Sequence, residues 1–331
     1  MTKHLLVCLF IFQVFLAEAQ EYSIVFIHIG KEIPSYTETA LSQARLFNKN
    51  CNLILLANEA ALKKHVEHEP NLNITYISCE SLKETSYHEK FLQKTSLDKN
   101  SREGFWLYAS ERFLYLNDLI QQYRLENVFH MEYDNMLYVD LSELLPIFQS
   151  KYKGIAATFD NDDRCIPGFV YIPNPKSMNH LAKCFADHAL ENQNDMQILA
   201  TFKKEKGAKE IDHLPILTKE YASKHSLISD FGHIAKNKSK YFQNIDLFQS
   251  IFDAAALGQY LGGIDPRNGE SKPGFINESC VFNPSFLVFE WIPDNQGRQI
   301  PYIVYPNAKY RINNLHIHSK NLSAFHSRRA M

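Results

Sequence analysis

Short apolar stretches alternate with helical patterns in the first half of the chain, and this alternation limits the folds that the chain can adopt. Residues 23–30, 52–57 and 73–78 are apolar stretches of strand length, and helical patterns occupy 36–48 and 105–123. Strands that return to one sheet through helices lie parallel to each other. The order therefore predicts an α/β fold with a mostly parallel sheet and helices on both of its faces.

The second half of the chain predicts a smaller antiparallel part. The expected elements are strands at 154–159 and 168–172, helices at 176–191, 195–202 and 253–261, and antiparallel strands at 285–292 and 300–305. No internal repeat or low-complexity linker divides the sequence. We therefore expect residues 20–331 to form a single domain.

Residues 1–19 have the pattern of a cleaved signal peptide. A basic start precedes an apolar run at 5–16, and Ala-Glu-Ala at 17–19 gives a small-x-small cleavage pattern before Gln20. A short signal anchor is the alternative, but the run is shorter than the ~20 residues that span a bilayer. We expect a mature chain in the secretory lumen or outside the cell, without a transmembrane span.

Charge and cysteine content narrow the possible partners. The net charge is −2 and the basic residues are scattered, so the sequence does not favour a nucleic-acid partner. An odd number of cysteines follows the expected cleavage point, which leaves at least one unpaired or paired between chains, and no Cys/His spacing suggests zinc. These cysteines are Cys51, Cys79, Cys165, Cys184 and Cys280. The glycosylation sequons, which support a glycoprotein only weakly, begin at Asn73, Asn237, Asn277 and Asn321.

Two carboxylates follow a buried strand near the middle of the chain. Residues 128–131 are mostly apolar, and Glu132 and Asp134 come directly after them. Alternate residues of an extended segment project to the same side, and ligands of open α/β sheets bind at the carboxyl ends of strands. Carboxylate oxygens there suit Mg²⁺ or Mn²⁺, which completes its shell with water and substrate phosphates. The pattern favours a metal–diphosphate site, although an acidic strand end that only faces solvent has the same residues.

The order of motifs over residues 23–322 resembles the GT-A fold glycosyltransferases, especially the glycogenin-like and galactosyltransferase-like group. In that group the end of the first strand and the turn after it hold the nucleotide, which implies this role for His28 and Gly30. An arginine on the helix before the metal site contacts the donor, and Arg112 has the matching place. An aspartate at a later helix start is matched by Asp195.

The resemblance also implies a metal site made from both halves of the chain. The Asp-x-Asp motif of the group is matched by Glu132 and Asp134, with glutamate in place of the first aspartate. A late histidine that binds the metal and a lysine that binds the diphosphate are matched by His316, His318 and Lys320.

The implied activity is metal-dependent transfer of a sugar from a nucleotide-diphosphate sugar, with a UDP-sugar favoured, to a glycan or protein acceptor. The implied cofactor is Mn²⁺ or Mg²⁺. An inverting enzyme needs a carboxylate base near the acceptor hydroxyl, and Asp253, Asp265 and Glu290 are the candidates. The choice between an inverting and a retaining reaction stays open.

Three alternatives remain at this point. A sugar-nucleotide pyrophosphorylase shares the implied fold, but residues 28–34 lack the glycine-rich loop that such enzymes place after the first strand. A secreted carbohydrate-binding module belongs to another class of protein. A catalytically inactive GT-A-like protein that binds carbohydrate or nucleotide is the third, because Glu132 departs from the metal motif.

Overall fold

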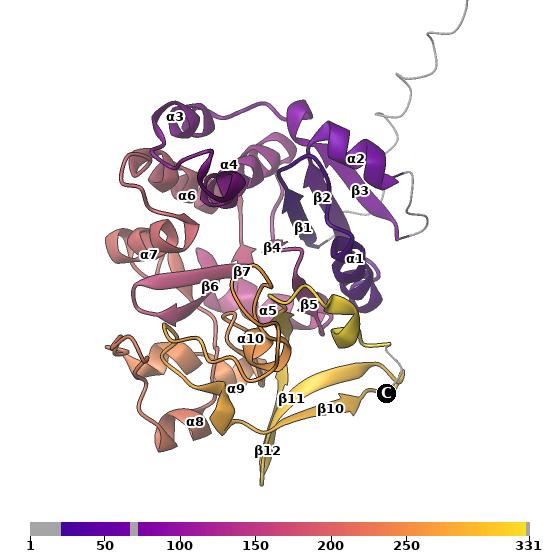
Figure 1. The fold of residues 1–331 in the computed structure, drawn as a ribbon, viewed down its shortest axis with the longest axis vertical. Coiled ribbons are helices and arrows are strands. Elements are labelled where there is room, and N and C mark those ends of the chain that lie inside the picture. The colour runs from indigo at the N-terminus through magenta and orange to yellow at the C-terminus, as the bar shows by residue number, and fades with distance from the viewer. Residues whose placement is uncertain (1–20, 67–71, 329–331) are drawn as a thin grey trace, which may run out of the picture.

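A seven-stranded sheet runs through the middle of the molecule (Figure 1). The structure is a computed structural model that describes residues 21–66 and 72–328, and the predicted signal peptide at 1–19 lies outside the described residues. The strand order is β3-β2-β1-β4-β7-β6-β8. Neighbouring strands are parallel except at β7, which is antiparallel to β4 and β6. The strands are β1 (Ser23–His28), β2 (Asn52–Ala57), β3 (Ile74–Ser78), β4 (Val128–Met131), β6 (Ile155–Asn161), β7 (Arg164–Ile172) and β8 (Ile211–His213).

Helices cover both faces of this sheet, because its strands present apolar side chains alternately to one face and to the other. Ile24 and Phe26 of β1 pack into one hydrophobic core, which includes residues of α1 and α5. Val25 and Ile27 pack into a second core, which includes residues of α4, α6 and α7. Side chains of successive strand residues point to opposite faces, so an apolar run buries both. The helices are α1 (Tyr36–Phe47), α2 (Glu59–Val66), α3 (Ser86–Lys94), α4 (Phe105–Tyr123), α5 (Leu141–Lys151), α6 (Pro175–Asp187) and α7 (Asp195–Lys206).

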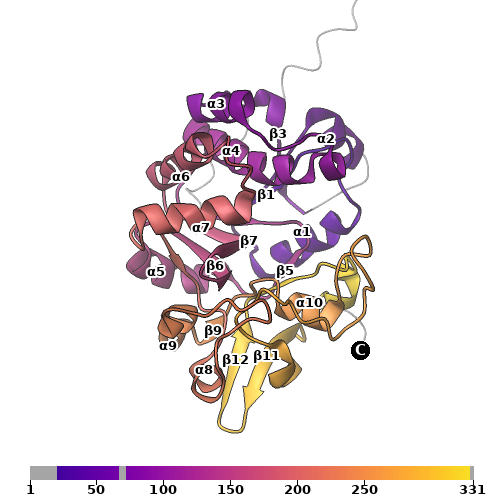
Figure 2. The ribbon, with the colours of Figure 1, turned by 60° about the vertical axis from the view of Figure 1, so that its left-hand side comes forward.

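Two smaller sheets complete the fold, and the four-stranded one lies at one end of the molecule (Figure 2). A four-stranded sheet has the order β10-β11-β12-β9, and β13 pairs with β5 in a two-stranded sheet. Their strands are β5 (Asn135–Leu137), β9 (Ser250–Ile251), β10 (Phe289–Pro293), β11 (Gln299–Tyr305), β12 (Ala308–Ile312) and β13 (Asn314–His316). The short helices of this part are α8 (Lys219–Lys224), α9 (Ile245–Phe248) and α10 (Leu257–Gly262). The predicted fold class, a mostly parallel sheet flanked by helices with a smaller antiparallel part, is confirmed.

Two of the differences between the predicted and the observed elements have local reasons. The polar stretch after β3, for which no helix was predicted, contains α3, which buries only His88 and Phe91. So few buried positions leave a weak apolar pattern in the sequence. The helix expected at 253–261 begins later, at Leu257, because the carboxylate of Asp253 accepts the first backbone N–H groups of α10.

The five cysteines of the described residues are all buried, and none forms a disulfide. Burial raises the pKa of each thiol, so a thiol that has no cation beside it keeps its proton at neutral pH. Within the described residues, no helix combines the length and apolar character needed to cross a membrane.

Candidate active site

One pocket of about 750 Å³ lies at the carboxyl ends of β1 and β4. This is the edge of an α/β sheet at which ligands bind. Residues from both halves of the chain line the pocket. They include most of the site residues that were predicted from the sequence. Those residues are His28, Arg112, Glu132, Asp134, Asp195, Asp265, His316, His318 and Lys320.

The pairing of β13 with β5 brings the C-terminal segment to the carboxylates. His316 lies opposite Asn135 in this antiparallel pair, and Ile317 donates its backbone N–H to the carbonyl oxygen of Asp134 at 2.8 Å. The rings of His316 and His318 lie 4.3 Å apart in an edge-to-face arrangement. Residues nearly two hundred positions apart therefore share one site.

Opposite charges meet directly at this site. His316 Nε2 lies 2.8 Å from Glu132 Oε2 and 3.0 Å from Asp134 Oδ1. Lys320 forms an ion pair with the other oxygen of Asp134. Arg112 pairs with Glu132. Every charge in this group has a partner, as buried charges require.

These contacts keep the cluster ionised at neutral pH. Burial would raise the pKa of Glu132, but Arg112 and His316 hold it well below its usual range. His316 and Lys320 likewise outweigh burial and hold the pKa of Asp134 well below its usual range. Burial would lower the pKa of His316, but the two carboxylates raise it to about 10. Protonated His316 thus supplies the positive charge between the carboxylates in this structure, and a metal ion bound to this ring would take the place of the proton.

Three side chains offer ligand atoms to one point. The ligand atoms of Asp134, His316 and His318 all lie within 4.8 Å of one another. Burial, followed by the charge of His316, lowers the pKa of His318 to about 3, so this ring stays neutral, as metal ligation requires. The side-chain amide nitrogen of Gln259 lies 2.6 Å from Nδ1 of His318, and the amide oxygen has no hydrogen-bond partner among the described residues. Rotation of this amide by 180° would let its oxygen accept from Nδ1–H and would leave Nε2 for a metal. The donor set fits a divalent cation.

Glu132 is not one of the three residues whose ligand atoms converge. One of its oxygens faces Arg112 and the other faces His316. The structure therefore places Glu132 between a cation on α4 and a histidine on β13.

Two glycines allow the close approach of His316 to its neighbours. A Cβ atom on Gly168 would lie 2.7 Å from His316 Nδ1, and one on Gly258 would lie 2.1 Å from the His316 carbonyl oxygen. Real Cβ atoms do not come so close to other heavy atoms, so any side chain at either position displaces His316 or the backbone around it.

Asp195 links the cluster to α7. Its Oδ2 accepts a hydrogen bond from Arg112 at 2.7 Å, while its buried Oδ1 has no hydrogen-bond partner in the described part of the chain. Burial raises the pKa of Asp195 to about 6 against the opposing effect of Arg112. Asp195 lines the pocket, but its unpartnered oxygen is buried and is not exposed there.

Aromatic rings surround the end of β1. The ring of His28 lies 5.5 Å from that of Tyr133, which in turn lies 5.9 Å from Tyr36. Burial lowers the pKa of His28 to about 4, so its ring is neutral. Gly30 does not line the pocket, and its backbone N–H donates to Asn58 at 2.8 Å. The sequence did not single out these two tyrosines, because Tyr36 begins α1 and Tyr133 lies in a loop, and neither position has a distinctive pattern.

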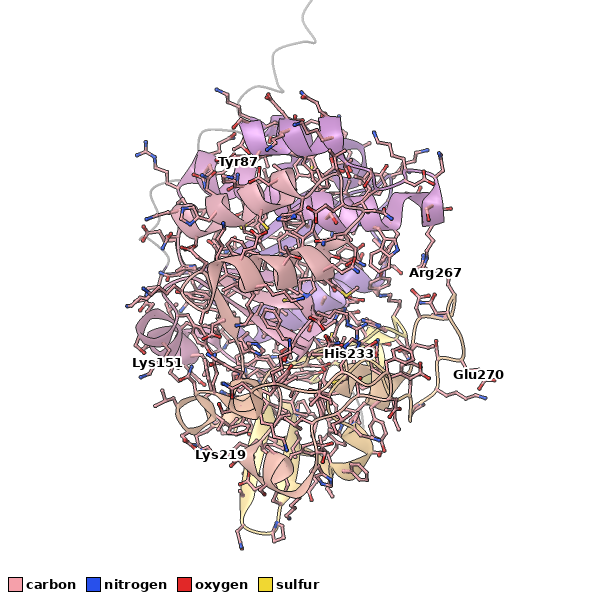
Figure 3. The ribbon with its side chains drawn as sticks, turned by 90° about the vertical axis from the view of Figure 1, so that its left-hand side faces the viewer. Tyr87, Lys151, Lys219, His233, Arg267 and Glu270 are labelled. Carbon is pink, nitrogen blue, oxygen red and sulfur yellow. The ribbon has the colours of Figure 1, made fainter. Side chains whose placement is uncertain are left out.

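The three predicted base candidates lie in different surroundings. Asp253 is outside the pocket lining, and its oxygens accept four backbone N–H groups, those of residues 256–258 and of His316. Glu290 is exposed on β10 and does not line the pocket. Asp265 does line it and is paired with Arg267, which lowers the pKa of Asp265 to about 2. Figure 3 shows Arg267 and Glu270 on the loop that projects at the right of that view.

Three aromatic residues at the start of α4 form a wall of the pocket that the sequence did not predict; we call them the aromatic wall. Phe105, Trp106 and Tyr108 line the pocket, and the side chains of Phe105 and Tyr108 are 42% and 37% exposed. Phe275 lines it from the C-terminal half of the chain. Apolar residues at the start of a helix normally predict core, so only the structure reveals that these face a cavity.

The similarity to known proteins concerns the fold. No protein-family profile matches this sequence, and no curated protein matches it. Among solved structures, apo mouse xyloside xylosyltransferase 1 is 13% identical, with 61% of this chain and 89% of that chain covered and a TM-score of 0.44. The galactosyltransferase LgtC, in complex with donor and acceptor sugar analogues, is 12% identical, with 62% and 78% covered and a TM-score of 0.40. The glycosyltransferase GlyE of Streptococcus pneumoniae TIGR4 is 13% identical, with 59% and 45% covered and a TM-score of 0.38.

At such TM-scores the likeness is too distant to assign chemistry, which has to be argued from the site. The solved structures that this chain is similar to nevertheless include glycosyltransferases, the kind of protein that its order of motifs resembles.

Proposed function

We propose that this chain is a metal-dependent glycosyltransferase that uses a nucleotide-diphosphate sugar, with a UDP-sugar favoured. The observation that carries the proposal is the convergence of Asp134, His316 and His318, with Lys320 and Arg112 beside them, in one pocket at the carboxyl edge of the sheet. Oxygen and imidazole ligands with a lysine and an arginine beside them suit a metal-bound diphosphate. In our proposal residues 20–331 act as a single domain.

Each part of the pocket has a role in this proposal. Mn²⁺ or Mg²⁺ held by Asp134, His316 and His318 would neutralise the diphosphate as it leaves. Lys320 turns from Asp134 to a phosphate oxygen, and Arg112, held by Glu132 and Asp195, keeps a fixed positive charge beside the donor. Preorganised charges of this kind stabilise the transition state without reorganisation.

The donor is oriented by the groups around the metal. Tyr36 and Tyr133, with the neutral ring of His28, form an aromatic site for the base at the end of β1. In this proposal the side chain of Asp195 turns its unpartnered oxygen toward a hydroxyl of the donor sugar. Asp265 is the one predicted base candidate that lines the pocket, and its low pKa suits hydroxyl binding better than proton abstraction.

The aromatic wall favours a glycan over a protein as the acceptor. Sugar rings present flat C–H faces that pack on aromatic rings, and Phe105, Trp106 and Tyr108 offer three rings on one turn of α4. The pocket is large enough for two ligands, since single ligand sites begin at about 300 Å³.

A binding and turnover assay tests the proposal. We expect UDP to raise the melting temperature in the presence of Mn²⁺ but not with EDTA, and we expect slow, metal-dependent hydrolysis of at least one nucleotide sugar without acceptor. Metal-dependent UDP binding without turnover of any nucleotide sugar or acceptor would support the inactive, nucleotide-binding alternative instead.

Replacement of Trp106 tests the acceptor side of the pocket. We expect Trp106→Ala to raise the acceptor KM about fivefold, which corresponds to the ~1 kcal/mol of an aromatic contact, and to leave UDP affinity unchanged. Steady-state kinetics over a panel of oligosaccharides measures this. The control is Phe231→Ala, since Phe231 is 65% exposed and does not line the pocket. An unchanged acceptor KM for Trp106→Ala would exclude the wall as the acceptor site.

Secretion is also a proposal, based on the sequence pattern of residues 1–19. We expect the chain to be cleaved before Gln20 when it is expressed in a secretory system. N-terminal sequencing of the purified protein gives the answer, and a product that still begins at Met1 would contradict the proposal.

A further inference from the structure

A second group of possible metal ligands lies away from the pocket, where the C-terminal ends of α6 and α7 meet. Cys184 is in the last turn of α6, His188 caps that helix, and Glu205 is in the last turn of α7. Their ligand atoms all lie within 4.8 Å of one another. None of them lines the active-site pocket.

The surroundings of His188 call for a cation. Its Nδ1 lies 2.8 Å from Glu191 Oε1, and its Nε2 lies 2.9 Å from Glu205 Oε1. A neutral imidazole carries one N–H, so it can donate to only one of these carboxylates. A further proton or a metal ion must therefore lie between the other ring nitrogen and its carboxylate. A carboxylate that holds one ring nitrogen of a metal-bound histidine is a common arrangement in proteins.

We propose that Cys184, His188 and Glu205 bind a zinc ion, with Glu191 holding His188 in the required orientation. Zinc accepts sulfur, nitrogen and oxygen ligands together, and three protein ligands leave its fourth position to water. Bond lengths of about 2.0–2.3 Å put tetrahedral ligands roughly 3.3–3.8 Å apart. His188 Nε2 and Glu205 Oε1, 2.9 Å apart, are closer than this and would separate slightly to admit the ion, while the Cys184 sulfur, within 4.8 Å of its partners, would approach by up to about 1 Å. Glu205 can supply its part of the movement because its side chain is 40% exposed.

The Cys184 thiol must lose its proton before its sulfur can bind zinc. Burial raises the pKa of Cys184 to about 12, so the thiol keeps its proton when no cation is present. Binding of zinc releases this proton to solvent as the S–Zn bond forms. Lys206, whose Nζ lies 3.7 Å from Glu205 Oε2, is the cation that competes on the exposed side.

The position of the site in the fold suggests what it does. The zinc ion would join the end of α6 to the end of α7, which lie side by side in Figures 1 and 2. The other end of α7 carries Asp195 into the active-site pocket. The site would thus fix the helix that presents Asp195, and its existence does not depend on the proposed transferase activity.

Cobalt absorption separates this site from the active site. Co²⁺ bound to a thiolate gives a charge-transfer band, whereas the group of Asp134, His316 and His318 contains no sulfur. Among the described cysteines, Cys184 alone belongs to such a group. We expect one equivalent of Co²⁺ to produce the band in the chelator-treated wild-type chain and in Asp134→Ala, and Zn²⁺ to remove it.

The variants make the outcome decisive. We expect Cys184→Ser to lose the band and Cys51→Ser, a matched change of another buried cysteine, to keep it. We expect His188→Gln, which leaves the thiol in place, to weaken Co²⁺ binding at least tenfold. Absence of the band in the wild type, or its persistence in Cys184→Ser, would overturn the proposal.

Discussion

Replacement of Asp134 by alanine is expected to abolish Mn²⁺-dependent UDP binding and to lower sugar transfer by at least a hundredfold. The change removes one of the three converging ligands, and it also removes a partner of both His316 and Lys320. The positively charged side chains of His316 and Lys320 then lie close together without the carboxylate that separates them. Calorimetry with UDP and Mn²⁺, followed by a transfer assay, measures both effects.

Asp134→Asn keeps the shape of the side chain and is the variant to use if the alanine variant does not fold. The control is Asp246→Ala, which removes an exposed carboxylate whose only described ion pair is with Lys219. We expect this control to behave as the wild type. Normal turnover of folded Asp134→Asn and Asp134→Ala would mean that the metal site is wrongly assigned.

The second large effect concerns Lys320. We expect Lys320→Ala to weaken UDP binding by roughly 1.5–3 kcal/mol, the range for hydrogen bonds to charged groups, or about ten- to a hundredfold in affinity. The reason is the position of the Lys320 ammonium group, which lies on Asp134 at the edge of the proposed metal site. Uridine has no phosphates, so its affinity should hardly change.

Isothermal calorimetry with UDP and with uridine separates the two contributions. Lys309→Ala provides a control for the loss of a lysine, because Lys309 is exposed on β12 and does not line the pocket. If Lys320→Ala binds UDP as tightly as the wild type does, the lysine has no role in diphosphate binding. An equal loss for UDP and uridine would instead indicate damage to the pocket as a whole.

The parts of the site that follow from local pattern could be predicted from the sequence. Glu132 and Asp134 follow an apolar strand, and their place at the carboxyl edge of the sheet is a consequence of chain direction. Arg112 lies two turns into an amphipathic helix, and its position relative to Glu132 follows once that helix packs beside β4. The alternation of strands and helices fixed the central sheet in the same way.

The rest depends on contacts between distant parts of the chain. Nothing near Gln259 in the sequence indicates that its amide contacts His318, because α10, which carries Gln259, meets the C-terminal segment only in the folded chain. Asp253 has the composition of a catalytic base, but the end of α10 uses both of its oxygens. No cysteine–histidine spacing in the sequence suggests zinc, although Cys184 and His188 are one helical turn apart, because the third proposed ligand, Glu205, comes from another helix.

The two glycines beside His316 offer a way to tell active relatives of this chain from inactive ones. At Gly168 and Gly258 there is no room for even a methyl group between the backbone and His316. In a homologue that keeps the histidine but carries alanine or serine at either glycine, the new side chain would push the imidazole away from its position beside Asp134. Such a protein could retain every polar residue of the site and still be a pseudoenzyme. The absence of a side chain at these two positions is therefore as informative about activity as the presence of the ligands.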